Sequence, residues 1–369
     1  MAENLAAPAA TTLAHVNVPP AQTWNYLHTN ECSFEVPAVA KNGNVFDPQP
    51  SVFLNIECPL GEDALAWIRK AAAEPRFVNV RAGSEEPVVI EVSPTGEAVA
   101  DTCVYVREGA NATIVMCTSG ASETAERATC ASLLRVIADR DAHVRIVELV
   151  AADDTVQHLE GVGIRAGRGA KVEVSQFFVG GAKVACGLGA DLAGDRADFD
   201  LSCRYYAEGK EELDITHTVR ARGRKTTEDM VVSGMLAGDA KKALRETIDL
   251  IHGSAGSVGN EAETVLVTGD GVVNKTLPVI LCDEDDVQGN HGATIGSISP
   301  DQLAYLADRG LSETEVEQLF ARAIFDDALF NVAEFGLAGA VTARAAQVLG
   351  PEAAKDMADG LDTNAAREE

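Results

Sequence analysis

The residues with the clearest potential for chemistry lie in one short stretch near residue 290. Cys282 and His291 are nine positions apart and flank the acidic run Asp283–Asp286. A thiolate and an imidazole offer one soft and one borderline ligand to iron, whereas carboxylates suit a hard cation or acid–base work on a sugar. Each feature also has an ordinary structural interpretation: a small buried cysteine, a hydrogen-bonded loop histidine and a solvated acidic loop.

A second candidate motif, for nucleotide binding, is weaker. Residues 269–276, GDGVVNKT, differ from a phosphate-binding P-loop at Asn274, which stands where the second glycine belongs. Leu277 and Pro278 then prevent the helix whose N-terminus holds phosphate in such loops. We therefore expect an inter-strand turn there and no nucleotide bound by this chain.

The cysteines do not form a recognisable metal motif. All eight are scattered singly, and no CxxC pair occurs, so a self-contained zinc finger or ferredoxin-type site is not supported. Scattered cysteines in a long chain also argue against a disulfide framework. Cys186, Cys203, His217 and His252 lie in strand-like sequence, and we interpret them as packing or turn residues.

The elements expected around His291 are an edge strand and a helical hairpin. Residues 277–281 form a short apolar run with a proline near its start, which is typical of the last, edge-type strand of a sheet. His291 then lies in a loop. Capping boxes that begin at Ser299 and Ser312 predict two helices, and Gly310 is suited to end the first of them.

The long central part of the chain shows a weak repeat. From about Phe77 to Leu281, short alternating runs follow turns that contain Gly or Asp and a small residue. Ala142, Ala170 and Ala197 mark three such turns and are 28 and 27 residues apart. This period indicates stacked units, so a β-solenoid is expected. No helical pattern separates the strands, as a βαβ fold would require, but periodicity alone leaves a flattened sandwich open.

Composition narrows the class of partner. The 369 residues are 46% hydrophobic but only 5% aromatic, and the formal net charge is −27. Nucleic acid is an unsuitable partner because binding its phosphates needs clustered Lys and Arg. No apolar run approaches the roughly 18 residues of a membrane span, and the first residues lack a signal-peptide pattern. We expect a cytoplasmic protein that does not contact a membrane.

Taken together, these motifs resemble the SufB/SufD family of iron–sulfur cluster assembly proteins. The resemblance covers most of the chain and is strongest from about residue 220 to 326. Gly289 departs from it, because many SufD relatives have a cysteine two residues before the histidine. The HGAT form is similar to SufD, since SufB has a glutamate-containing motif there. The matching residues are Thr23–Leu27, Asp229–Gly234, Gly256–Glu261, Asp286, Val287, His291–Gly296, Leu303, Tyr305, Leu306 and Arg309–Leu311.

The resemblance implies an all-β body, a right-handed parallel β-helix, flanked by N-terminal and C-terminal helical segments. We place an N-terminal segment at residues 1–76, with a disordered start and a helix near Asp63–Ala73. The β-helix core is placed at 77–296 and a C-terminal helical domain at 297–349. A flexible acidic tail is expected at 350–369.

The resemblance also implies a function as a non-catalytic scaffold subunit. Such a chain pairs with a SufB-like paralogue through its C-terminal edge, where a transient iron–sulfur cluster or iron forms. His291 is then the candidate metal ligand and Cys282 a weaker one. A SufC-like ABC-type ATPase would bind the helical hairpin through Leu303, Tyr305, Leu306, Arg309 and Gly310.

Two other functions remain compatible with the residues. One is a β-solenoid polysaccharide hydrolase or lyase, although few aromatic residues are present to stack on sugars and the acidic surface would repel a polyanion. The other is a passive structural solenoid without a nucleotide-linked partner. The isolated chain can also form a homodimer through its exposed edge.

Overall fold

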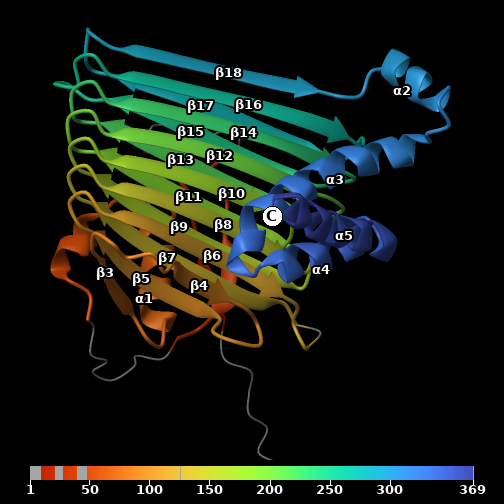
Figure 1. Cartoon of the computed structure of the whole chain (residues 1–369), viewed down its shortest axis with the longest axis horizontal. Helices are drawn as coiled ribbons and strands as arrows, with labels where there is room; N and C mark the ends of the chain where they lie inside the picture. Colours follow the sequence, from red (N-terminus) through yellow and green to blue (C-terminus); the bar gives the residue numbers. More distant parts are fainter. Residues whose placement is uncertain (1–9, 21–27, 40–47, 125, 369) are drawn as a thin grey trace, which may run out of the picture.

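Two parallel, eight-stranded sheets form the body of the protein (Figure 1). The computed structural model describes residues 10–20, 28–39, 48–124 and 126–368. The strand order is β18-β16-β14-β12-β10-β8-β6-β4 in one sheet and β17-β15-β13-β11-β9-β7-β5-β3 in the other. Consecutive strands therefore alternate between the sheets, and each pair makes one coil of a β-solenoid. We call the two layers the even sheet and the odd sheet.

The strand bounds follow the chain in order. The even sheet consists of β4 (Val88–Val92), β6 (Asn111–Gly120), β8 (His143–Ala152), β10 (Lys171–Phe178), β12 (Asp198–Ala207), β14 (Thr227–Ala237), β16 (Val258–Thr268) and β18 (Gln288–Gly296). The odd sheet consists of β3 (Arg76–Val80), β5 (Val99–Val106), β7 (Ala128–Ala138), β9 (Val156–Ala166), β11 (Lys183–Leu192), β13 (Glu212–Ala221), β15 (Lys241–Leu250) and β17 (Val273–Cys282).

The alanine repeat marks one corner of the coils, as the spacing predicts. Ala142, Ala170 and Ala197 are each at most 1% exposed. The peptide N–H that follows each alanine donates to the alanine carbonyl one coil earlier, as Lys171 N–H does to Ala142 O at 2.9 Å. The residue before each alanine has a left-handed backbone, for example Gly169 with φ 67°. Gly and Asp tolerate that conformation best, which explains their recurrence in the turns.

Aliphatic side chains fill the space between the two sheets. Ile146, Val174 and Leu201 occupy one register position on three neighbouring even strands, and each is at most 3% exposed. Alternate residues of each strand point into this interior. Burial of one such side chain contributes about 1.5–3 kcal/mol, so a stack of eight coils has a substantial core.

The N-terminal segment covers the outer face of the odd sheet. Helix α1 (Glu62–Ala71), in the predicted position, packs Trp67 and Ile68 against strands β7 and β9, and η2 (Ser51–Asn55) lies beside it in the chain. Strands β1 (Ala10–Leu13) and β2 (Phe34–Pro37) form an antiparallel pair. The expectation of disorder was therefore wrong for residues 10–13, while residues 1–9 and the Thr23–Leu27 motif lie outside the described residues.

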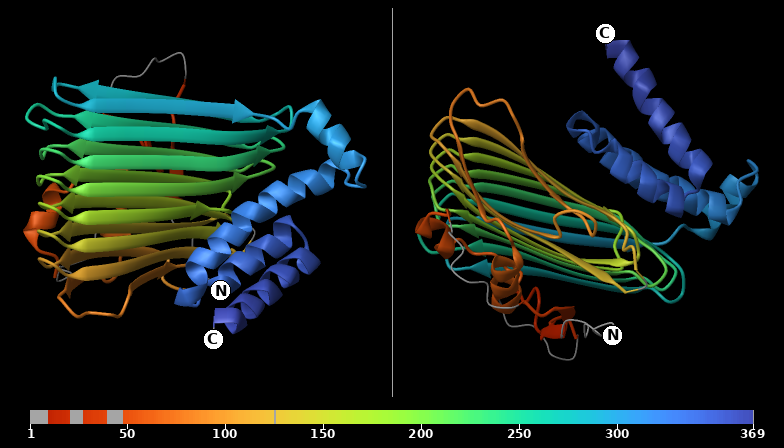
Figure 2. Two further views of the ribbon diagram at one scale, coloured as in Figure 1. Left: turned by 45° about the horizontal axis from the view of Figure 1, so that its top comes forward. Right: turned by 90° about the horizontal axis from the view of Figure 1, so that it is seen from below.

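The C-terminal helices cover the outer face of the even sheet, on the opposite side from the N-terminal segment (Figure 2). Phe325 of α3 (Glu313–Val332) packs against Tyr206 of β12, with ring centroids 5.9 Å apart. Among the described residues, no helix is long and apolar enough to cross a lipid bilayer. The helices are α2 (Pro300–Ala307), α3 (Glu313–Val332), η3 (Ala333–Phe335), α4 (Ala338–Val348) and α5 (Pro351–Glu368).

The expected flexible tail is instead a packed helix. Gly350, with φ 91°, separates α4 from α5, and Pro351 is the first residue of α5. Proline is well suited to that position, because its missing N–H would have no partner there. Ala354 and Met357 are 6% and 3% exposed and join the cluster under the helices. Two buried apolar residues three positions apart thus anchor a helix in acidic sequence.

Candidate functional site

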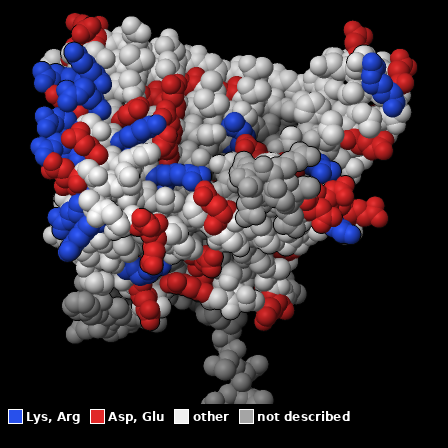
Figure 3. All heavy atoms as spheres, viewed as in Figure 1, with Lys and Arg blue, Asp and Glu red and all other residues white. Residues whose placement is uncertain are grey.

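The solenoid is open at its C-terminal end. β17 and β18 are the last strands of their sheets, and every residue of β18 is exposed. Ile295 on β18 is 58% exposed, and Val273 on β17 is 39% exposed. β18 contains no Asp, Glu, Lys or Arg, although both signs of charge occur elsewhere on the face in Figure 3. β18 thus presents an uncharged strand edge with unpaired backbone groups.

His291 lies on this open edge, in strand β18. The prediction of a loop at this position was wrong, since residues 288–296 continue the parallel pairing beyond β16. His291 is in register with Glu261 of β16, and its Nδ1 lies 4.0 Å from Glu261 Oε1. The His291 side chain is 51% exposed, whereas that of Glu261 is 1% exposed. An accessible imidazole therefore lies over a buried carboxyl group.

The environment of Glu261 makes that carboxyl group unusual. Burial, together with the nearby carboxylates of Glu246, Glu228 and Glu263, raises its pKa to about 9. A carboxyl group with such a pKa is protonated at neutral pH. It can then act as a hydrogen-bond donor beneath the edge rather than as a negative charge.

Cys282 lies at the end of β17, in the odd sheet. It is exposed, and its thiol donates a hydrogen bond to the carbonyl of Glu284 at 3.3 Å. In the described part of the chain, Cys282 and His291 share no hydrogen bond, and they lie on strands of different sheets. Cys282 and His291 therefore both lie at the open edge, but they do not contact each other through a hydrogen bond.

The acidic run after Cys282 is a structured turn. The Glu284 carboxylate accepts hydrogen bonds from the backbone N–H groups of Gly253 at 2.8 Å and Asp285 at 3.0 Å. These N–H groups lower the pKa of Glu284. Because the turn occupies this carboxylate, the ordinary interpretation of the run explains it better than a hard-metal site.

The helical hairpin α2–α3 projects beyond the solenoid next to this edge (Figures 1 and 2). Both predicted capping boxes are present. None of the residues Pro300–Ala307 is buried, and Tyr305 is 56% exposed. The Arg309 guanidinium lies 3.5 Å from the Tyr305 ring centroid and donates to the Tyr305 carbonyl at 3.1 Å. Leu303 and Leu306 are half-buried, and Gly310 is exposed with φ 87°.

An apolar hollow connects the hairpin with the strand edge. It has a volume of about 430 Å³ and lies between α3 and the even sheet. Phe320 and Ile324 of α3 and Leu266 of β16 line it, together with Thr294 of β18. Phe320 is 43% exposed. The hollow extends the uncharged surface of β18 toward the helices.

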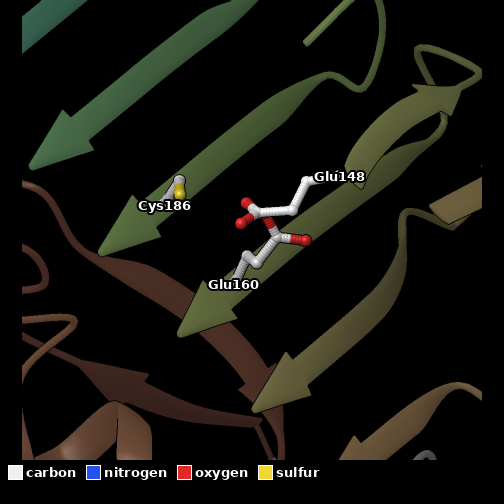
Figure 4. A group of neighbouring side chains, drawn as sticks. All are labelled: Glu148, Glu160 and Cys186. Atoms are coloured by element: carbon white, nitrogen blue, oxygen red, sulfur yellow. The ribbon is translucent and has the colours of Figure 1, made fainter. Parts of the chain in front are cut away.

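Sequence reasoning missed a polar cluster inside the solenoid (Figure 4). Glu148, Glu160 and Cys186 bring one ligand atom each to within 4.8 Å of the others. All three are buried, and we had interpreted Cys186 as a packing residue. The available signal was a glutamate at a buried position of each of two strands, β8 and β9.

Comparisons with known proteins agree with this architecture. Residues 90–324 match the family model described as SUF system FeS cluster assembly, SufBD core domain. Over 157 residues, 42% of this chain, it is 24% identical to the iron-sulfur cluster assembly protein SufD of Bacillus subtilis. Over 260 residues, 67% of this chain, it is 25% identical to an iron-sulfur cluster assembly SufBD family protein of Mycobacterium bovis.

These matches span 36% and 64% of the two relatives' own lengths. A third relative, a SufBD family protein of Synechocystis, is 23% identical over 208 residues. The matched family model covers both sheets from β4 to β18 and most of α3. This chain therefore belongs to the SufBD family of the SUF iron–sulfur cluster assembly system.

Proposed function

We propose that this chain is a scaffold subunit that pairs with a SufB-like paralogue and a SufC-like ATPase during iron–sulfur cluster assembly. The open edge formed by β17 and β18 is the observation that carries this proposal. A solenoid that ends in exposed strands offers a row of backbone donors and acceptors to a partner with a similar edge. Family membership favours this function over a polysaccharide enzyme or a passive solenoid.

The chemistry of the edge fits an uncharged, partly apolar partner surface. The whole chain has a net charge of −27, yet β18 carries no charged side chain of its own. Two acidic proteins can approach each other here without placing carboxylates in direct opposition. Ile295 and the adjoining hollow add apolar area that pairing would remove from water.

His291 would supply a ligand at the junction between the two scaffold subunits. Its imidazole is accessible, and imidazole nitrogen binds iron well. The nascent cluster is cargo in this scheme, and the paralogue would provide further ligands. Cys282, exposed on the neighbouring sheet, is a weaker candidate because the chain does not hold it beside His291.

The hairpin α2–α3 would receive the ATPase. Tyr305 and Arg309 form an exposed stacked pair, and such residues are common anchors at interfaces. Phe325 and Leu329 of the same helix α3 pack on the even sheet. A movement imposed on the hairpin by ATP hydrolysis would thus be transmitted to the sheet that ends in β18. The chain would transmit motion without hydrolysing nucleotide itself.

Coproduction of the three proteins tests this proposal. The chain should co-elute with its paralogue and the ATPase in size-exclusion chromatography. The isolated chain, run at the same concentration, should elute as a monomer or as a homodimer formed through the same edge. Absence of any complex when all three folded chains are present would contradict the scaffold function.

A further inference from the structure

The interior cluster of Glu148, Glu160 and Cys186 combines three side chains from both sheets. Glu160 of β9 and Cys186 of β11 are register partners on neighbouring odd strands. Glu148 reaches them from β8 of the even sheet, and its carboxyl group faces that of Glu160 (Figure 4). Their ligand atoms all lie within 4.8 Å of one another. Small side-chain movements would bring them into the range of first-shell ligands around one ion.

Two oxygen atoms of this cluster lack partners. Glu148 Oε1 and Glu160 Oε1 have no hydrogen-bond partner among the described residues, although the two side chains are 0% and 1% exposed. An enclosed carboxylate oxygen without a donor is costly, because it loses the hydration that water would supply. A cation between the two carboxyl groups would give both oxygens a partner.

Neighbouring groups hold the three side chains in place. Gln176 Nε2 donates to Glu148 Oε2 at 2.8 Å and lies 3.5 Å from Cys186 Sγ. His158 Nε2 lies 3.3 Å from Glu160 Oε2. Such outer partners typically orient metal ligands and tune their affinity.

We propose that Glu148, Glu160 and Cys186 form a buried site for one divalent first-row transition-metal ion, of the class of Fe²⁺ or Zn²⁺. A thiolate with two carboxylates suits these borderline ions. Mg²⁺ and Ca²⁺ are disfavoured, because they require six or more oxygen ligands and do not select thiolate. A divalent ion would give both unpartnered oxygens a partner.

This site is distinct from the cluster junction proposed at His291. β8 and β18 are five strand steps apart in the even sheet, which corresponds to about 24 Å at the usual strand spacing. An ion held there would cross-link the two sheets in the middle of the solenoid. The inference therefore goes beyond the proposed scaffold function and can fail independently of it.

Metal analysis of the full chain tests the site. The protein is produced in cobalt-supplemented medium and purified anaerobically, and iron, zinc and cobalt are measured per chain. Wild type should carry about one ion, with a thiolate-to-cobalt charge-transfer absorption. Cys186→Ser should abolish that absorption. Cys130→Ser, which changes another fully buried cysteine in the interior, should keep it.

Glu148→Gln provides a second variant that preserves side-chain shape. It should lower bound metal at least about tenfold, since even outer-shell changes commonly have that effect. Circular dichroism establishes that each variant has folded. Metal-free wild-type protein would overturn the proposal, as would a charge-transfer absorption that persists in Cys186→Ser.

Discussion

His291 Nδ1 lies 4.0 Å from Glu261 Oε1, across two strands that pair in register at the open end of the solenoid. The imidazole is half-exposed and the carboxyl group is buried. The pair therefore joins the surface that we propose binds the paralogue to a polar group inside the coil. Changes at Glu261 can therefore be used to probe the edge without removing its histidine.

Glu261→Gln should weaken the dependence of stability on pH. The folded chain holds the Glu261 proton up to about pH 9, because burial and nearby carboxylates raise the pKa of that group. The unfolded chain releases it near pH 4.5, so wild-type stability falls as pH rises between the two values. Glutamine does not titrate in this range. In Glu261→Gln, the slope of the free energy of unfolding against pH should therefore be smaller by up to about 1.4 kcal/mol per pH unit.

Urea unfolding at several pH values between about 5 and 8.5 measures that slope. The wild type should lose more stability over this range than Glu261→Gln. Equal slopes in the two proteins would show that Glu261 titrates in the folded chain as it does in the unfolded chain.

Ile295→Glu should block pairing with the paralogue while the chain stays folded. The side chain is 58% exposed, so the cost to the free energy of unfolding should be within about 0.5 kcal/mol. A charge on the neutral edge would have to be desolvated on pairing. Val231→Glu, at a 42% exposed position of β14, which has a paired strand on either side, is the matched control.

Pull-down with the paralogue provides the readout for both variants. Binding should be lost in Ile295→Glu and kept in Val231→Glu. Full binding by Ile295→Glu would place the paralogue on another surface.

The double change Tyr305→Ala and Arg309→Ala should weaken ATPase binding and leave paralogue binding intact. The stacked pair is exposed, and truncation of interface anchors commonly costs 2 kcal/mol or more, which is roughly thirtyfold in Kd. Phe330→Ala, a 57% exposed aromatic near the other end of α3, controls for loss of apolar area. Equal ATPase affinity for the wild type and the double variant would remove the hairpin from this interface.

Met357→Ala should destabilise the chain by about 2–5 kcal/mol, as expected for a buried methionine. Lys355→Ala, at an exposed position of α5, should change stability by less than about 0.5 kcal/mol. Thermal or urea unfolding compares the two. A negligible effect of Met357→Ala would mean that α5 does not contribute to the folded core.

The solenoid was predictable because its signals are local and repeated. Ala142, Ala170 and Ala197 stack in register, and the coil length equals their spacing. The capping boxes at Ser299 and Ser312 also lie within single helix turns. Each of these features depends on residues close together in sequence, so the pattern alone identifies it.

The interior cluster and the position of α5 were not predictable in this way. Glu148, Glu160 and Cys186 meet only because the coils place β8 opposite β9 and β11. In the sequence, Met357 is an apolar residue within an acidic segment. Its packing partners on the outer face of the even sheet are far away in the chain, so the local pattern does not show that it is buried. Likewise, β18 lacks the apolar alternation of a buried strand, because its inward face has no coil above it.

The most direct test of the account is the iron and sulfide content of the complex with the SufB-like and SufC-like proteins, assembled anaerobically. His291→Ala is compared with wild type and with His252→Ala, whose histidine is 82% exposed on a neighbouring turn. We expect intact complexes in all three cases and a marked loss of cluster only in His291→Ala. Unchanged cluster content in an intact His291→Ala complex would contradict the assignment of this edge as the cluster junction.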